Sequence, residues 1–201
     1  MIASGAARAQ SRPLDPEGAL QELLAGNKRF VSRRTTAHEE DLSILRQNTA
    51  EKQEPFAAIL SCADSRVPVE IIFDQSIAHL FVTRVAGNVA TPEIIASLEY
   101  GVAVLGTKAI LVLGHANCGA VKAAIEGKDV PGQISVLYSR IQAAVDQAGS
   151  NLEAAIKANA KIQSALLSKT STVISRSVKE NKLKVAAGYY DIAGGGVTLL
   201  D

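Results

Sequence analysis

Two stretches of the chain decide its fold, Phe56-Ala-Ala-Ile-Leu-Ser-Cys62 and Lys108-Ala-Ile-Leu-Val-Leu-Gly-His115. Each is a short apolar run that ends in small or polar residues, which is typical of a buried parallel strand. A third run, Leu80-Phe-Val-Thr-Arg-Val85, lies between them in the chain and ends at Gly87-Asn88. Because helical patterns separate these runs, we predict an α/β fold with a mainly parallel central sheet flanked by helices.

The residues before the first strand predict a helical N-terminal arm. Asp15-Pro16 is a helix start, because Asp caps a first turn and Pro fits the first helical position. Leu20, Leu23 and Phe30 then recur at helical spacing. Further helices are expected at 41–52, 91–105, 119–126, 134–146 and 151–179, and further strands at 183–187 and 197–200.

The chain divides into a short tail and one domain. Residues 1–14 are small and polar with no core pattern, whereas 15–54 form the arm and 55–201 the α/β core of a domain over 15–201. Ala7-Arg8-Ala9 is similar to the end of a secretory signal, although no charged and apolar segment precedes it. The tail is therefore a cytoplasmic extension or the remainder of a signal in a periplasmic protein, and both compartments stay open.

Composition excludes several classes of protein. The 201 residues are 47% hydrophobic and 20% charged, which excludes a largely disordered chain. Lys and Arg number 21 against 20 Asp and Glu, so no basic excess indicates nucleic acid as a partner. The longest apolar runs are far shorter than the roughly 20 residues of a membrane span. Two cysteines build no disulfide framework, and they point instead to thiolate or metal chemistry.

Both cysteines follow predicted strands at the carboxyl end, where open parallel sheets bind their ligands. Cys62 ends the first strand, and His115 and Cys118 come directly after the third. Two thiolates and an imidazole are ligands that zinc prefers, and three protein ligands leave a fourth position for water, as in catalytic sites. The spacing alone leaves two alternatives open, cysteines that only pack in the core and a disulfide in an oxidising compartment.

Asp64 and Arg66 follow Cys62 at alternate positions, so all three side chains point to one side if the segment is extended. A carboxylate there can ligate a metal or accept a hydrogen bond from metal-bound water, and Arg66 would keep it ionised through a two-point contact. The alternative is a plain ion pair in a loop. Zinc with two thiolates is neutral, so acidifying its water depends on such neighbours.

These segments, Cys62-Ala-Asp-Ser-Arg66-Val-Pro and His115-Ala-Asn-Cys118-Gly, resemble the motif pair of the β-class carbonic anhydrases. The similarity covers nearly the whole chain, because it continues in Leu24-Ala-Gly-Asn-Lys-Arg-Phe30, Phe81-Val-Thr-Arg84 and Gly188-Tyr-Tyr-Asp191. It implies one Zn²⁺ per chain held by Cys62, His115 and Cys118, with Asp64 and Arg66 as the catalytic pair. It also implies a homodimer, or a multiple of dimers, with the active site at the subunit interface.

Three further positions match the substrate pocket of plant-like members of the family. Gln53 resembles a side chain that reaches the partner's site and hydrogen-bonds bicarbonate, and Phe81 and Tyr100 resemble apolar walls of the CO2 pocket. Without the resemblance, these residues would be a polar helix end, a strand core residue and a helix core residue. His79 is interpreted as a surface or hydrogen-bonded histidine, with a proton relay as the alternative.

Some bacterial members carry a regulatory bicarbonate site built from a Trp, an Arg and a Tyr. Arg84 and Tyr190 match the last two, but Ile59 stands in place of the Trp, and the chain has no tryptophan. We therefore predict that this regulatory site is absent and that Asp64 pairs with Arg66 instead of binding zinc.

The resemblance implies reversible hydration of CO2 to bicarbonate and a proton, with zinc-bound hydroxide as the nucleophile. The net charge of +1 and the lack of a basic cluster fit an uncharged substrate. Two alternatives remain at this point: a hydrolase of carbonyl sulfide or carbon disulfide on the same scaffold, and a non-catalytic zinc module in which Asp64 is a permanent fourth ligand.

Overall fold

A five-stranded sheet organises residues 15–37 and 51–200, which the computed structural model describes. Its strands are β1 (Ala57–Ser61), β2 (Leu80–Arg84), β3 (Ala109–His115), β4 (Lys184–Tyr190) and β5 (Val197–Leu200). The order across the sheet is β2-β1-β3-β4-β5. The first four strands are mutually parallel, and only β5 runs antiparallel to its neighbour β4. The predicted α/β fold with a mainly parallel sheet is thereby confirmed.

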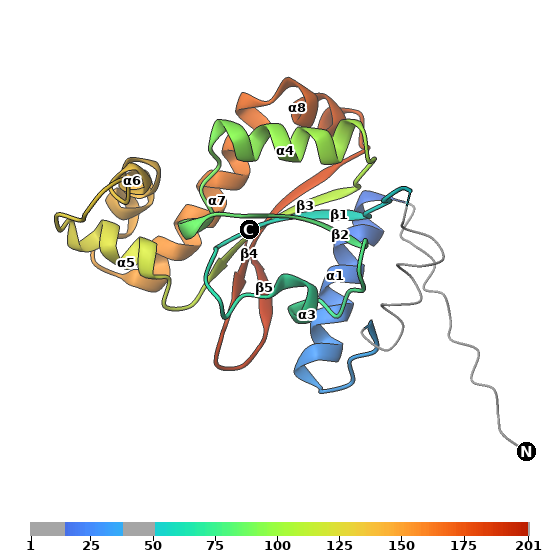
Figure 1. Cartoon of the computed structure of the whole chain (residues 1–201), viewed down its shortest axis with the longest axis horizontal. Helices are drawn as coiled ribbons and strands as arrows, with labels where there is room; N and C mark the ends of the chain where they lie inside the picture. Colours follow the sequence, from blue (N-terminus) through green and yellow to red (C-terminus); the bar gives the residue numbers. More distant parts are fainter. Residues whose placement is uncertain (1–14, 38–50, 201) are drawn as a thin grey trace, which may run out of the picture.

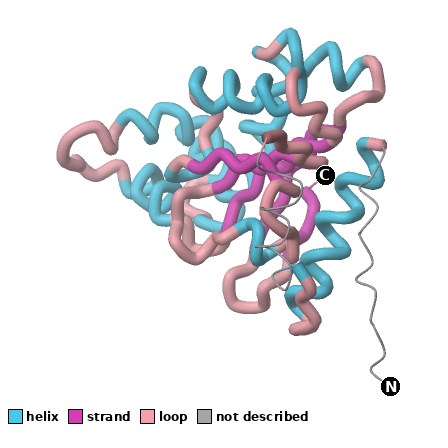
Figure 2. The backbone as a smooth tube through the Cα atoms, turned by 45° about the vertical axis from the view of Figure 1, so that its right-hand side comes forward, coloured by secondary structure: helices cyan, strands magenta, loops and turns pink. Residues whose placement is uncertain are grey.

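Helices cover both faces of this sheet. They are α1 (Pro16–Val31), α3 (Val69–Ile72), α4 (Pro92–Ala103), α5 (Gly119–Glu126), α6 (Val136–Ala148), α7 (Leu152–Thr170) and α8 (Thr172–Lys179), with a 3-10 turn η2 (Ala86–Asn88). α1 and α3 lie on one face and α4 and α8 on the other (Figure 1). Figure 2 shows the strands in the middle of the molecule with helices around them. Within the two described ranges, no helix is long and apolar enough to cross a membrane.

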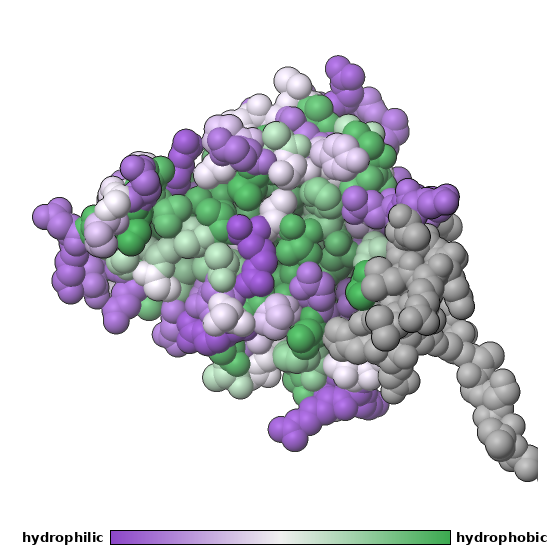
Figure 3. All heavy atoms as spheres, in the orientation of Figure 1, coloured by the Kyte–Doolittle hydropathy of each residue, from purple (hydrophilic) through white to green (hydrophobic). Residues whose placement is uncertain are grey.

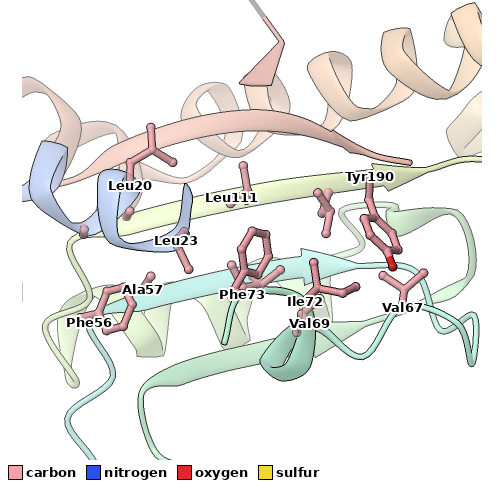
Figure 4. Close-up of a cluster of buried hydrophobic side chains, with 14 residues drawn as sticks. Leu20, Leu23, Phe56, Ala57, Val67, Val69, Ile72, Phe73, Leu111 and Tyr190 are labelled. Carbon is pink, nitrogen blue, oxygen red and sulfur yellow. The ribbon is translucent and has the colours of Figure 1, made fainter. Parts of the chain in front are cut away.

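The two central strands are apolar along their whole length because both of their faces are covered. Ile59 and Leu111 point into the cluster beneath α1, whereas Leu60 and Val112 point into the cluster beneath α4 and α8. Figure 4 shows the first cluster, in which Leu20 and other α1 residues lie over β1 and β3. Every residue of β1 and β3 is buried, which explains the continuous apolar runs in the sequence.

The predicted arm helix is present, and a buried amide ties it to the core. The Asp15 side chain accepts a hydrogen bond from the Gly18 N–H and so caps α1. Asn27 donates hydrogen bonds to the carbonyls of Ile72 and Gly195 and accepts one from the Val197 N–H. One residue of α1 therefore links α3 and the loop before β5.

Two features of the structure differ from the local predictions, and one predicted helix is not tested. The predicted helix at 41–52 falls almost entirely outside the described residues. The predicted helical stretch 151–179 is two helices, because Ser171 is extended and its hydroxyl caps α8 through the Ile174 N–H. The one-turn helix α3 was missed, since four residues carry too little periodicity to detect.

Candidate metal centre

The candidate metal ligands lie beyond the carboxyl ends of the neighbouring strands β1 and β3. Cys62 follows β1, His115 is the last residue of β3, and Cys118 is the N-cap of α5. Asn117 has a φ of 56°, and this left-handed turn brings Cys118 back beside His115. The three ligand atoms all lie within 4.8 Å of one another, and all three residues are buried. The structure thus brings together the three predicted ligands.

The orientation of His115 suits a metal ligand. Its Nδ1 lies 2.9 Å from the carbonyl oxygen of Ala116, which can only accept, so Nδ1 carries the proton. Nε2 is then the ring nitrogen left for a metal. This atom is buried and has no hydrogen-bond partner within the described part of the chain. A metal ion would satisfy it.

The two cysteine sulfurs lie close together, and each shifts the pKa of the other. The Cys118 thiol donates a hydrogen bond to Cys62, and this contact lowers the pKa of Cys62 far below that of a free thiol. The same contact and burial raise the pKa of Cys118. Both residues are free cysteines. Two cysteine sulfurs and an imidazole nitrogen that are buried side by side form a donor set that fits zinc, which binds cysteines as thiolates.

Asp64 and Arg66 form the predicted pair beside this cluster. Arg66 Nε donates to Asp64 Oδ1 at 2.9 Å and Nη2 donates to Oδ2 at 2.8 Å. The Arg66 side chain holds the pKa of Asp64 well below its usual range, and the Arg66 backbone N–H adds to this. Asp64 Oδ2 also lies 3.9 Å from His115 Nε2, so the carboxylate borders the position a metal would take.

The geometry of this pair differs from the extended segment considered in the sequence. Residues 64–67 form a turn, in which the Val67 N–H bonds to the Asp64 carbonyl. The Asp64 carboxylate closes the turn by accepting the Arg66 N–H. Both side chains therefore meet because the backbone turns, and alternation along a strand is not the cause.

Backbone contacts around Cys62 escaped the sequence analysis. Arg84 Nε donates to the Cys62 carbonyl and Arg84 Nη2 to the Asp64 carbonyl, so the guanidinium clamps the loop between them. The Gly87 N–H donates to Cys62 Sγ at 3.4 Å. The only signal in the sequence was the Gly87-Asn88 pair, which indicates a left-handed turn without saying what it faces.

The three predicted substrate-binding residues are not brought to the metal ligands within one chain. Phe81 pairs with Ala58 in the sheet, which places it about 13 Å along the strand from Cys62. The Phe81 and Tyr100 rings contact each other, with centroids 6.3 Å apart. Gln53 is exposed ahead of β1, at the amino end of the sheet. All three residues therefore lie at or near the amino end of the sheet, whereas the metal ligands lie at its carboxyl end.

Three other positions singled out in the sequence have ordinary packing roles. His79 Nδ1 lies 3.2 Å from Gln75 Oε1, and its ring packs edge-on against Phe56. Ile59, which stands in place of the regulatory tryptophan, is fully buried in the sheet. Tyr190 is buried at the end of β4.

Comparison with known proteins places the chain in a family. The family model described as carbonic anhydrase matches residues 57–197. Carbonic anhydrase 2 of Mycobacterium tuberculosis is 46% identical over 111 residues, which cover 55% of this chain and 53% of that protein. A carbonic anhydrase of Pseudomonas aeruginosa is 33% identical over 175 residues, covering 79% of each chain. The chain thus spans about half the length of the mycobacterial relatives that it matches.

Solved structures share the fold. The β-carbonic anhydrase CafA of Aspergillus fumigatus matches with a TM-score of 0.75 and 24% identity, covering 90% of both chains. The β-carbonic anhydrase CcaA matches with a TM-score of 0.73 and 25% identity, covering 90% of this chain and 87% of that one. The matched family region contains the Cys62, His115 and Cys118 cluster together with Asp64 and Arg66. The chain therefore belongs to the β-class carbonic anhydrase family.

Proposed function

We propose that this protein catalyses the reversible hydration of CO2 to bicarbonate and a proton, with Zn²⁺ as its cofactor. The observation that carries the proposal is the position of the Asp64 carboxylate. It is held by two hydrogen bonds from Arg66, and it lies 3.9 Å from the free Nε2 of His115. A cluster that only bound a structural metal would not need an ionised carboxylate fixed beside it.

The cofactor would be held by the two thiolates and the imidazole. A zinc ion there lowers the pKa of a water molecule that it binds, which makes hydroxide available near neutral pH. The protein's own groups then direct the reaction. Asp64 accepts a hydrogen bond from the nucleophile and so fixes the direction in which its oxygen lone pair points.

The low pKa of Asp64 defines this role. Because Arg66 keeps the pKa of the carboxyl far below its usual range, Asp64 stays ionised at neutral pH and acts only as an acceptor. Arg66 makes its two side-chain bonds in a geometry that lysine cannot reproduce. It therefore also restrains Asp64 from moving onto the metal.

Both oxygens of Asp64 are engaged by Arg66, which argues against the non-catalytic zinc module. In that alternative Asp64 would be a permanent fourth ligand, and its carboxylate would be turned away from the guanidinium.

The apolar wall for CO2 is proposed to come from a second copy of the chain. Tyr100 is 48% exposed and Val104 is 63% exposed, so this end of α4 presents apolar surface. Figure 3 shows hydrophobic side chains gathered across the middle of one face of the molecule, between hydrophilic groups at its rim. Exposed apolar surface of this kind marks interfaces. A homodimer would let Gln53, Phe81 and Tyr100 serve the site of the partner subunit.

Stopped-flow CO2 hydration tests the proposal. The zinc-loaded wild type is expected to hydrate CO2. Asp64→Asn retains the metal but loses about 10- to 100-fold in rate, because its amide can donate to the nucleophile and misorient it. Cys118→Ser loses both zinc and activity. The exposed control Glu180→Gln matches the wild type. Carbonyl sulfide and carbon disulfide are assayed in parallel, and hydrolysis of either without CO2 hydration would overturn the proposal.

A further inference from the structure

The backbone N–H groups of Gly87 and Asp64 both reach the sulfur of Cys62, and the direction of the Gly87 N–H depends on an unusual loop. The Gly87 N–H donates to Cys62 Sγ at 3.4 Å. Gly87 has a φ of 74° within the 3-10 turn η2, a conformation that side-chain-bearing residues rarely adopt. A Cβ at this position would lie 2.9 Å from Ile141 Cδ1. The turn is thus closely packed, and a small rotation of its peptide would move the N–H away from the sulfur.

Two side chains of α7 hydrogen-bond to the backbone of this turn and of the residues after it. Asn159 Nδ2 donates to the Gly87 carbonyl at 2.8 Å, and Asn159 Oδ1 accepts from Gln163 Nε2 at 3.1 Å. Gln163 Oε1 accepts from the Ala90 N–H at 2.9 Å, and its Nε2 also donates to the Arg140 carbonyl. The two amides therefore grip the loop at residues 87 and 90.

Both amides are buried on a helix face that is otherwise apolar. Asn159 is 1% and Gln163 is 2% exposed, and their buried neighbours on α7 include Ile156 and Leu167. Burying two amides is unfavourable unless their hydrogen bonds are satisfied. Here all four side-chain N and O atoms are bonded, so the pair forms a complete network with a single geometry.

We propose that Asn159 and Gln163 are positioning residues of the metal centre, which aim the Gly87 N–H at the sulfur of Cys62. The inference rests on the proposed metal site. A hydrogen bond to a thiolate withdraws electron density from the sulfur, so the sulfur donates less charge to a bound metal. In a Cys2His site, where two thiolates already neutralise the ion, this keeps the metal more strongly Lewis-acidic. The side-chain hydrogen bonds of both amides go to backbone groups and to each other, and none goes to a candidate metal ligand in the described part of the chain.

Cobalt substitution gives a readout of the sulfur itself. The Co²⁺-loaded protein absorbs in the near ultraviolet through charge transfer from sulfur to metal. Because the hydrogen bond stabilises the sulfur lone pairs, its loss is expected to shift this band to longer wavelength. Asn159→Leu removes the grip on Gly87 directly and should shift the band more than Gln163→Met, which leaves the Asn159 bond in place. In CO2 hydration, zinc-loaded Asn159→Leu should lose about 10- to 100-fold in rate. Zinc-loaded Gln163→Met should lose less.

Asn27→Leu is the matched control. Asn27 is also a buried helix amide that donates to two backbone carbonyls, but it ties α1 to Ile72 and Gly195. It should lower stability and leave the band unshifted.

The outcomes separate the inference from the proposed function. Where Asn159→Leu does not fold, Gln163→Met decides through the same band. An unshifted band in the folded variants, or an equal shift in Asn27→Leu, overturns the positioning role. If the cobalt-loaded wild type shows the band and the variants shift it, but the zinc-loaded wild type hydrates no CO2, only the proposed function is overturned. A wild type without a sulfur-to-cobalt band overturns both.

Discussion

The residues of the candidate site were singled out by type and by their place at strand ends, and the resemblance to the β-class carbonic anhydrases favoured a metal site over core packing, a disulfide or a plain ion pair. Cys62, His115 and Cys118 do cluster as expected. The contact between Asp64 and Arg66 was expected as well, although it is made in a turn.

Contacts made by backbone atoms could not be predicted at this scale. The Gly87 N–H and the carbonyls of Cys62 and Asp64 take part in the site, yet every residue carries the same groups. Which of them point inward depends on φ and ψ, and the groups that contact these backbone atoms, such as Asn159 at Gly87 and Arg84 at Cys62, are far away in the sequence.

A single buried carboxylate fixes the end of the arm helix and gives a pH-dependent prediction. The Asp74 side chain has 0% exposure and accepts bonds from Arg29 and from the N–H groups of Thr36 and Ala37. Burial alone would raise the pKa of Asp74, but these bonds outweigh it and leave the pKa lowered. Its stabilisation is therefore complete above the unfolded pKa of about 3.9 and is lost as the pH falls through the lower folded value.

Asp74→Asn is accordingly expected to lower the free energy of unfolding at pH 7 by about 1–3 kcal/mol. The difference from the wild type should shrink as the pH falls below about 4. Urea unfolding at a series of pH values measures it, and loss of zinc at low pH affects both proteins equally. Glu180→Gln, which breaks an exposed pair with Lys182, should change stability by less than about 1 kcal/mol. A difference for Asp74→Asn that does not depend on pH would contradict the account.

At the scale of elements, buried strands and capped helices were predictable because each has a local cause. β1 and β3 are apolar on both faces, and Thr91 caps α4, because its side chain accepts from the Ile94 N–H. The break at Ser171 was harder to predict, because serine is tolerated inside a helix and also caps helices. Its hydroxyl also donates to Glu99 of α4, a contact that only the folded chain supplies.

The seating of α1 on the core depends on one glycine. A Cβ at Gly26 would lie 1.8 Å from the Phe73 carbonyl oxygen, which is backbone and cannot move aside alone. Gly26→Ala should therefore displace α1 and lower the free energy of unfolding by about 1–3 kcal/mol or more. In Gly196→Ala the new Cβ meets no atom within 4 Å, so a change within about 0.5 kcal/mol is expected. Chemical denaturation compares the two, and equal stabilities would show that α1 is not held this closely.

At the scale of the molecule, the parallel direction of the strands explains why one chain holds only part of the proposed site. The ligands lie beyond the carboxyl ends of β1 and β3, whereas Phe81 lies early in β2 and Tyr100 contacts it from α4. Parallel pairing keeps these two groups at different ends of the sheet. The sequence supplied the residues of the pocket, and the expectation of a site at the subunit interface, only through resemblance.

Subunit complementation tests the shared site. Tyr100→Ala and Asp64→Asn should each hydrate CO2 poorly as pure proteins. In a mixed dimer, one site contains both defects and the other contains neither. Random co-assembly is therefore expected to restore about a quarter of the wild-type rate. A mixture no more active than the average of the two pure variants would mean that Tyr100 serves the site of its own chain or none.

The central claim is that a zinc ion on Cys62, His115 and Cys118 gives this protein its CO2 hydration activity. The most direct measurement is a titration of the metal-free protein with zinc, with the stopped-flow hydration rate recorded after each addition. The rate is expected to rise linearly and to level off at one zinc per chain, with no such rise in Cys118→Ser. Zinc bound at one per chain without CO2 hydration, or a rate that does not depend on zinc, would contradict it.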